Sequence, residues 1–344
     1  MYQGYKIVVN TAAGRRRYMQ YLVPPILESD IVDRYDIWIN THNMLDIEFF
    51  TQLAKHYSKV NLVWQPDGIV NGIQSINAFY RNCIEDKTIY MKLDDDVVWF
   101  EPDLFKKMVK FRVENRNAFL VSPLVINNSL STYLLQIHNK IKLNKYYEAQ
   151  CSHPILWENG KFAVELHHWF IQNYLIPNNY SELYIGKQPW GITRFSINCI
   201  LWFGEDMKVF HGIVPGDDED FLSCIYPSQN GLYNCINGDA IISHFAFGPQ
   251  RVQLDQAQIL EKYGEILYKL WKKTPKLNEI NECIIKILKD IEEQKEILAL
   301  KSSPYKKVNQ PQKKNLYFRN ILPKKIRRAL RIIMEKEPLQ YIQK

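Results

Sequence analysis

Residues Thr88–Phe100 read Thr-Ile-Tyr-Met-Lys-Leu-Asp-Asp-Asp-Val-Val-Trp-Phe, and this stretch decides the predicted fold. A β-rich apolar run ends in three consecutive carboxylates, Asp94, Asp95 and Asp96, and a second apolar run follows at once. Adjacent like charges repel one another, so a positive group is expected beside them. A divalent cation fits, because Mg²⁺ and Mn²⁺ prefer oxygen ligands and are often held by carboxylates and substrate phosphates. On the tripeptide alone, a polar loop that closes a strand is the alternative.

Strand-like and helix-like patterns alternate around this stretch. The predicted strands cover 5–10, 35–40, 60–64, 88–93 and 118–121. The predicted helices cover 15–27, 46–57, 74–83 and 102–115. Pro24 and Pro25 are expected to interrupt or end the first helix. Such alternation indicates βαβ units, so we predict an α/β protein with a Rossmann-like, mixed and mostly parallel sheet flanked by helices.

Ligands of open α/β sheets bind beyond the carboxyl ends of the strands. This rule singles out the segments 11–17, 40–43, 66–71 and 94–96. The arginines of the first segment suit an anionic ligand, and an exposed helix start is the alternative.

The pattern is less regular in the second half of the chain. Predicted strands cover 192–202 and 240–243, and a helical pattern runs from 254 to 300. The second of these strands runs into His244. A lone histidine after a buried strand is more often structural, but a neutral histidine is also a common metal ligand.

The composition is that of a globular protein. Hydrophobic residues make up 46% of the 344 residues, and no apolar run reaches the roughly 18 residues of a spanning helix. The N-terminus lacks the pattern of a secretory signal, and the six cysteines form no Cys-x-x-Cys pair. We therefore expect a cytoplasmic protein.

The net charge of +7 belongs to the C-terminal tail. Residues 301–344 contain 13 Lys or Arg and 2 Asp or Glu, a balance of +11, whereas residues 1–300 contain 31 and 35, a balance of −4. Apolar residues recur among the basic ones of 315–334. This segment is predicted to be a basic amphipathic helix that lies on an anionic membrane surface. A solvated helix that caps the domain and a disordered basic end are the alternatives.

A second acidic cluster, Gly216-Asp-Asp-Glu-Asp-Phe221, lies far along the chain. Glycine suits a tight turn, and the helix dipole favours one or two acids in a first helical turn. Four acids repel one another, so we interpret the cluster as part of a site in which one carboxylate is a general base.

These features, in this order, resemble glycosyltransferases of the GT-A fold, over roughly residues 5–250. Leu93-Asp-Asp-Asp-Val97 resembles their Asp-x-Asp motif, and Gly216–Phe221 resembles the Gly-Glu-Asp-x-Asp signature of inverting members. His244 resembles the downstream histidine of their metal site. The stretch Val8–Arg15 is similar to the first nucleotide-binding loop of the fold. Asp217 departs from the pattern, because glutamate is usual there.

The resemblance implies roles for particular residues. The metal ligands of a Mn²⁺ or Mg²⁺ ion would be Asp94, Asp96 and His244. The catalytic base would be Asp218, with Asp217 and Asp220 as alternatives because the register of the motif is open.

Six residues are expected to contact the nucleotide sugar. Trp190, beside a glycine, is expected to offer its ring as a platform for the sugar, with burial in the core as the alternative. Asp95 is expected to point toward the donor sugar or a basic neighbour such as Lys92. The six expected contacts are Thr11, Arg15, Asn40, Asp94, Asp95 and Trp190.

Three regions are predicted on this basis. Residues 1–250 would form the GT-A catalytic domain, with a nucleotide-binding half at 1–125 and an acceptor half at 126–250. Residues 251–300 would form C-terminal helices, and 301–344 a basic linker and amphipathic, helical extension.

The predicted function is a metal-dependent, inverting glycosyltransferase. It would move a sugar from a nucleoside-diphosphate sugar, a UDP-sugar above all, to a glycan or lipid-linked acceptor of a surface polysaccharide such as lipopolysaccharide. Its tail would hold it peripherally on the inner face of the cell membrane. A nucleotidyltransferase that acts on sugar phosphates is the first alternative, although it needs no acidic base. A nucleic-acid-binding protein is the second, but the body is acidic and carries no such motif, so no nucleic-acid partner is expected.

Overall fold

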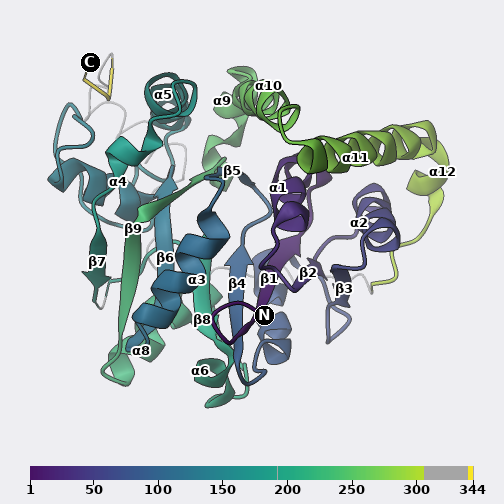
Figure 1. Cartoon of the computed structure of the whole chain (residues 1–344), viewed down its shortest axis with the longest axis horizontal. Coiled ribbons are helices and arrows are strands. Elements are labelled where there is room, and N and C mark those ends of the chain that lie inside the picture. The colour runs from purple at the N-terminus through teal and green to yellow at the C-terminus, as the bar shows by residue number, and fades with distance from the viewer. Residues whose placement is uncertain (192, 306–339, 344) are drawn as a thin grey trace, which may run out of the picture.

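The fold is seen in a computed structural model, which describes residues 1–191, 193–305 and 340–343 (Figure 1). Within these residues nine strands form one sheet. The strands are β1 (Lys6–Ala13), β2 (Arg34–Ile39), β3 (Val60–Trp64), β4 (Thr88–Leu93), β5 (Val97–Phe100), β6 (Ala118–Ile126), β7 (Lys187–Trp190), β8 (Cys199–Phe203) and β9 (Tyr233–His244).

Helices cover the sheet, and most of them connect consecutive strands. The α-helices of the described residues are α1 (Arg16–Glu28), α2 (Met44–His56), α3 (Leu104–Glu114), α4 (Ser129–Ile137), α5 (Gly160–Phe170), α6 (Gly204–Lys208), α7 (Asp218–Asp220), α8 (Tyr226–Gln229), α9 (Arg251–Gln256), α10 (Ile259–Trp271), α11 (Pro275–Glu293) and α12 (Lys295–Leu300). The 3₁₀-helices are η1 (Gly72–Asn82), η3 (Tyr180–Leu183) and η5 (Gly248–Gln250), and the π-helices are η2 (Ile171–Leu175) and η4 (Phe221–Ile225).

The strand order is β3-β2-β1-β4-β8-β6-β9-β5, and β7 also pairs with β9. From β3 to β4 all neighbours are parallel, as the alternation of strands and helices predicts. After β4 the sheet becomes mixed, because β8 is antiparallel to both β4 and β6. The predicted α/β class, a Rossmann-like, mixed and mostly parallel sheet with flanking helices, is confirmed.

The sheet is buried on both faces. Alternate residues of one strand enter different cores: Val8 of β1 belongs to one hydrophobic cluster, and Ile7 and Val9 belong to the other. The first cluster includes side chains of η1, α4, α5 and α10, and the second includes side chains of α1, α2, α3 and α11. Strands with two covered faces are nearly continuous apolar runs, which explains why Lys92 is the one charged residue of 88–93.

Two expectations about local structure are wrong. Helix α1 continues through Pro24 and Pro25 to Glu28, so the prolines neither interrupt nor end it there. Both prolines remove helical N–H donors, but Leu22, Val23 and Ile26 on the same turns are buried, and burial outweighs that loss.

The second wrong expectation is the strand predicted over 192–202. Strand β8 begins only at Cys199, and residue 192 lies outside the described residues. The strand predicted over 240–243 is the end of the longer β9. In both cases the partner strands lie far away in sequence, so local patterns do not set the boundaries.

Both neighbours of the basic tail segment are attached to the body. The Tyr305 hydroxyl donates to the carbonyl of Ile39 at 2.6 Å, and the ring of Tyr341 packs against Phe162 of α5. The predicted amphipathic helix at 315–334 lies outside the described residues. Among the residues that are described, no helix is both long and apolar enough to cross a bilayer. Helices α9 to α12 occupy 251–300, and the division into three regions stays a prediction.

Gly204 offers a test of this packing. A Cβ at this position would lie 2.0 Å from the carbonyl oxygen of Glu85, so the backbone itself would have to shift. Gly204→Ala is expected to lower the free energy of unfolding by at least about 1–3 kcal/mol, the usual cost of overpacking. Denaturant unfolding measures this. Gly248→Ala, where a Cβ would meet nothing within 4 Å, is the matched control, and equal stability of the two variants would contradict the packing.

Candidate active site

The three aspartates form the turn between β4 and β5. The amide of Val97 donates to the carbonyl of Asp94 at 3.2 Å, which closes the turn. Strand β5 then pairs antiparallel with β9, with Val97 opposite His244, and the amide of Phe245 donates to the carbonyl of Asp96 at 2.8 Å. Backbone pairing therefore brings His244 beside a carboxylate that lies 148 positions earlier in the numbering.

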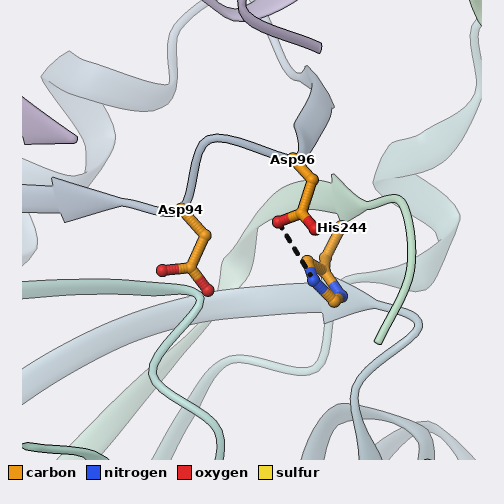
Figure 2. A group of neighbouring side chains, drawn as sticks. All are labelled: Asp94, Asp96 and His244. Carbon is orange, nitrogen blue, oxygen red and sulfur yellow. Dashed lines mark ion pairs between the residues drawn. The ribbon is translucent and has the colours of Figure 1, made fainter. Parts of the chain in front are cut away.

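Asp94, Asp96 and His244 form a group that could hold a divalent ion. One ligand atom from each lies within 4.8 Å of the other two (Figure 2). Figure 2 shows the carboxylate of Asp96 and the ring of His244 facing one another, with Nε2 3.3 Å from Oδ1. The other ring nitrogen, Nδ1, lies 3.3 Å from the carbonyl of Asn127, which leaves Nε2 for the ion.

The donor chemistry of this group fits Mn²⁺ or Mg²⁺. Ligands of one Mg²⁺ at about 2.1 Å lie at most about 4.2 Å apart, so only a small closure of the group is required. The oxygens of Asp96 divide their contacts: Oδ1 faces His244, whereas Oδ2 faces Arg15 at 3.0 Å and Arg251 at 3.6 Å. One oxygen can therefore ligate an ion while arginines hold the other.

Charge balance keeps Asp96 ionised. Burial alone would raise the pKa of Asp96, but the charges of Arg15, His244 and Arg251 outweigh it and hold this pKa well below its usual range. Burial alone would lower the pKa of His244, and Asp96 reverses this and raises it. The carboxylate thus carries its charge before any ion arrives.

Asp95 does not contact Lys92. Its carboxylate accepts from the amide of Gly14 at 3.0 Å and from Nε of Arg15 at 3.1 Å, and Nη2 of Arg15 also pairs with it. Lys92 instead donates to Oδ1 of Asp94 at 2.9 Å. Of the two basic neighbours, Arg15 is therefore the partner of Asp95, and the pair ties the end of β1 to the turn after β4.

Asp218 is the one buried aspartate of the second acidic cluster. The Tyr80 hydroxyl donates to its Oδ2 at 3.0 Å, and Nζ of Lys92 lies 4.0 Å from the same oxygen. Burial raises the pKa of Asp218, and Lys92 and Tyr80 offset part of this effect. Since Lys92 also contacts Asp94, one ammonium group connects the predicted metal ligands with the predicted base.

The remaining acids of this cluster face Arg194. Its Nη2 lies 2.9 Å from Asp217 and 2.8 Å from Glu219, and Nη1 lies 3.9 Å from Asp220. Asp217 also caps the helix start by accepting from the amide of Glu219 at 3.0 Å. These contacts explain how four acids coexist, and they give Asp217 and Asp220 structural partners.

The other predicted donor contacts lie in different environments. Thr11 is fully buried in β1 and accepts from Tyr35 at 3.1 Å. The amide of Asn40 donates to the carbonyl of Gly72 at 3.1 Å, and its oxygen accepts from Ser75. Trp190 lies on β7, half-buried, and its indole N–H donates to the carbonyl of Thr193. None of the hydrogen bonds or ion pairs of the described residues joins these three to the carboxylate group, so their roles stay predictions.

Sequence reasoning missed several groups of the site. The sequence points to Lys92 only as a neighbour of Asp95, and it does not single out Tyr80, Asn127, Asn198 or Arg251. Asn198 donates to Oδ2 of Asp94 at 3.1 Å. A lysine inside an otherwise apolar strand was the available signal for Lys92, because a buried ammonium group requires an anionic partner.

Comparisons with known proteins were made at three levels. No family model matches the chain, and no curated protein matches it. Solved structures do match. Residues 1–349 of TarS from S. aureus align with 9% identity and a TM-score of 0.41, over 85% of this chain and 91% of that one. GalNAc-T7 with UDP, GalNAc and Mn²⁺ aligns with 10% identity and a TM-score of 0.42, over 84% and 57%.

A third similar structure is glucosyl-3-phosphoglycerate synthase from Mycobacterium tuberculosis with Mn²⁺, UDP-glucose and phosphoglyceric acid, at 10% identity and a TM-score of 0.35 over 77% and 80%. Two further matches, a mycobacterial protein and a 4-diphosphocytidyl-2C-methyl-D-erythritol synthase from Anaerococcus prevotii, are covered over 41% and 57% of their lengths, so this chain spans about half of each. All these TM-scores lie below 0.5, so the activity has to be argued from the geometry of the site.

The carboxylate–histidine group predicts binding of Mn²⁺ by the protein alone. Asp96→Ala and His244→Ala each remove one ligand, and each is expected to weaken Mn²⁺ binding by at least about 10–100-fold, the range known for loss of an outer-shell partner. Isothermal titration with Mn²⁺ measures this. Asp290→Ala, on the exposed face of α11, is the control, and wild-type affinity in both site variants would refute the ligand assignment.

Proposed function

We propose that this protein is a metal-dependent, inverting glycosyltransferase that uses a nucleoside-diphosphate sugar. The observation that carries the proposal is the two-part site. An Asp94–Asp96–His244 group of oxygen and nitrogen ligands lies next to a separate, buried carboxylate, Asp218, and Lys92 is within 4.0 Å of carboxylates of both parts. These two parts suit the transfer of a sugar from a diphosphate, with an ion for the leaving group and a base for the attacking hydroxyl.

The first part serves the diphosphate. The ion that Asp94, Asp96 and His244 would hold supplies positive charge where the leaving diphosphate gains negative charge. Arg15 and Arg251 lie beside Asp96, and Nη1 of Arg15 and Nε of Arg251 have no hydrogen-bond partner within the described chain. Free guanidinium donors next to an ion site suit phosphate oxygens.

The second part serves the acceptor. Asp218 accepts the proton of the acceptor hydroxyl as its oxygen attacks the anomeric carbon, which has oxocarbenium character in reactions of this kind. A single displacement inverts the anomeric centre. Asp218 is favoured over Asp217 and Asp220, which are more exposed and pair with Arg194.

Further residues complete the proposed donor site. Arg15 and Asp95 meet at the turn, so they are placed to contact the nucleotide or its phosphates. Thr11 would contribute through the backbone, since its hydroxyl is already bonded. Asn40 and Trp190 are proposed contacts of the nucleotide and of the sugar, respectively. We further propose a UDP-sugar as donor, with Mn²⁺ or Mg²⁺ as the ion.

The acceptor is proposed to be a glycan or a lipid-linked glycan of a surface polysaccharide such as lipopolysaccharide. A cytoplasmic enzyme would meet such an acceptor at the inner face of the membrane, and the +11 balance of residues 301–344 suits an anionic surface.

The competing functions are less well supported. A nucleotidyltransferase that acts on sugar phosphates has no use for the buried base carboxylate Asp218. The −4 balance of residues 1–300 does not favour a nucleic-acid partner.

Turnover and its products test the proposal. With Mn²⁺, a UDP-sugar and candidate acceptors, the wild-type protein is expected to release UDP. A nucleotidyltransferase would release no UDP in this assay, and it would instead release pyrophosphate when given UTP and a sugar 1-phosphate. A thermal-shift screen of UDP-sugars with Mn²⁺ first identifies the donor, since a bound ligand stabilises the folded state.

Asp218→Asn is expected to lower kcat by about 10²–10⁴-fold, the usual contribution of a general base. Asp220→Asn and Asp217→Asn, measured in the same assay, identify the base among the three acids. Activity lost in Asp220→Asn and kept in Asp218→Asn would move the role to Asp220. Unchanged turnover in both Asp96→Ala and Asp218→Asn would reject the site.

The pH dependence follows from the burial of Asp218. Its pKa is raised, and only the ionised carboxylate accepts a proton, so kcat/KM is expected to fall as the pH drops through this raised pKa. The acid limb of the pH profile should therefore lie above the ordinary aspartate value of about 3.9. A limb at the ordinary value would show that the base is an exposed carboxylate.

A further inference from the structure

We propose that Lys92, together with Tyr80, is a positioning residue that holds the Asp218 carboxylate ionised and directs one of its oxygens toward the acceptor. This inference rests on the proposed function only in that it takes an acceptor hydroxyl to be the group that approaches Asp218. The arrangement itself, an ammonium and a phenol that hold one buried carboxylate, is independent of the reaction.

The first observation is the place of Lys92. It is 3% exposed and lies within β4, whose other side chains are also buried. A buried ammonium group needs anionic partners because burial without them is costly. The partners of Lys92 therefore indicate what Lys92 does. Within the described residues its ion pairs are with Asp94 at 2.9 Å and Asp218 at 4.0 Å, and both acids belong to the site.

The second observation is that Tyr80 and Lys92 approach the same oxygen. The Tyr80 hydroxyl donates to Oδ2 of Asp218, the oxygen that faces Lys92. No hydrogen bond to Oδ1 is found in the described part of the chain, so Oδ1 is the oxygen that can accept the proton of the acceptor hydroxyl. Tyr80 is fully buried, with its ring against Trp38 and Trp202, and therefore it fixes the direction of the bond.

The third observation is that η1 also holds the backbone before Asp218. The side-chain amide of Asn77 donates to the carbonyls of Val214 and Gly216, each at 2.7 Å. Gly216 has a φ of +69°, a conformation that residues with a Cβ rarely adopt. The loop, the tyrosine and the lysine thus fix the carboxylate from three elements.

The charges around Asp218 give Lys92 an electrostatic role. Lys92 faces it from β4, Tyr80 from η1, Asp94 from the turn and Asp217 from its own helix start. Lys92 is the one cation in this set, and Arg194 is occupied by Asp217 and Glu219. Burial and the two acids raise the pKa of Asp218, and Lys92 opposes them. Without Lys92, the carboxyl would be protonated over more of the pH range.

Kinetics test the electrostatic role. Lys92→Met is expected to move the acid limb of the kcat/KM profile upward by about one pH unit and so to lower kcat/KM up to about 10-fold on that limb, measured at saturating Mn²⁺ because Lys92 also contacts Asp94. Tyr80→Phe should move the limb in the same direction by less. Lys107→Met removes a lysine that pairs with buried Glu101 outside the site, and it should leave the limb in place. A uniform loss of rate in Lys92→Met with an unmoved limb would overturn the proposal.

A stability cycle tests the pairing without any substrate. Lys92→Met is expected to lower Tm clearly in the wild-type background and less in the Asp218→Asn background, because the variant then leaves no unpaired carboxylate at 218. The same cycle with Lys107→Met should be additive. Additivity for Lys92 and Asp218 would overturn the pairing. Coupling in Tm without any turnover of UDP-sugars would reject the proposed function and keep the pairing.

Discussion

Mutual repulsion of buried carboxylates is the constraint around which this molecule is arranged. Asp95, Asp96 and Asp218 are nearly excluded from solvent, and Asp94 lies beside them. Three basic groups from different elements pair with these four acids. Arg15 before α1 pairs with Asp95 and Asp96, Lys92 in β4 pairs with Asp94 and Asp218, and His244 at the end of β9 faces Asp96. Strands β1 and β4 are neighbours in the sheet, and the pairing of β5 with β9 brings His244 to the turn after β4, so the fold and the charge balance of the site depend on each other. A change in either would leave buried charge without a partner, which costs several kcal/mol.

The parallel half of the fold could be predicted from the sequence because its signals are local. Apolar runs at 5–10, 35–40, 60–64 and 88–93 are separated by helical patterns, and each strand's polar end marks the same edge of the sheet. The mixed half could not be predicted to the same extent. Strand β7 has no signal of its own, and β8 and β9 take their limits from pairing partners 44 to 147 positions away, from Trp190 opposite Asn234 to Val97 opposite His244.

The site divides in the same way. The aspartates, His244 and Asp218 were found because their residue types are unusual where they occur, and the structure brings Asp94, Asp96 and His244 together. Partners such as Arg251 and Tyr80 have no such signal, since arginines and tyrosines are common on helices. For Asp95 the sequence points to the donor sugar or to a basic neighbour such as Lys92, whereas its partners in the structure are Arg15 and the amide of Gly14, which lie at the end of β1. Which oxygen faces which cation is a property of side-chain geometry that no spacing encodes.

The π-helix η4, which follows the acidic cluster directly, limits how this chain can change in length. In η4 the amide of Tyr226 reaches the carbonyl of Phe221, five positions back, so this turn contains one residue more than an α-helical turn. Each residue turns an α-helix by about 100°, so removal of one residue of η4 would rotate Asp218 relative to the chain that follows, away from Lys92, and would also disturb the ring contact of Phe221 with Tyr226. Insertions and deletions between 218 and 226 should therefore be far less tolerated than substitutions that preserve the spacing.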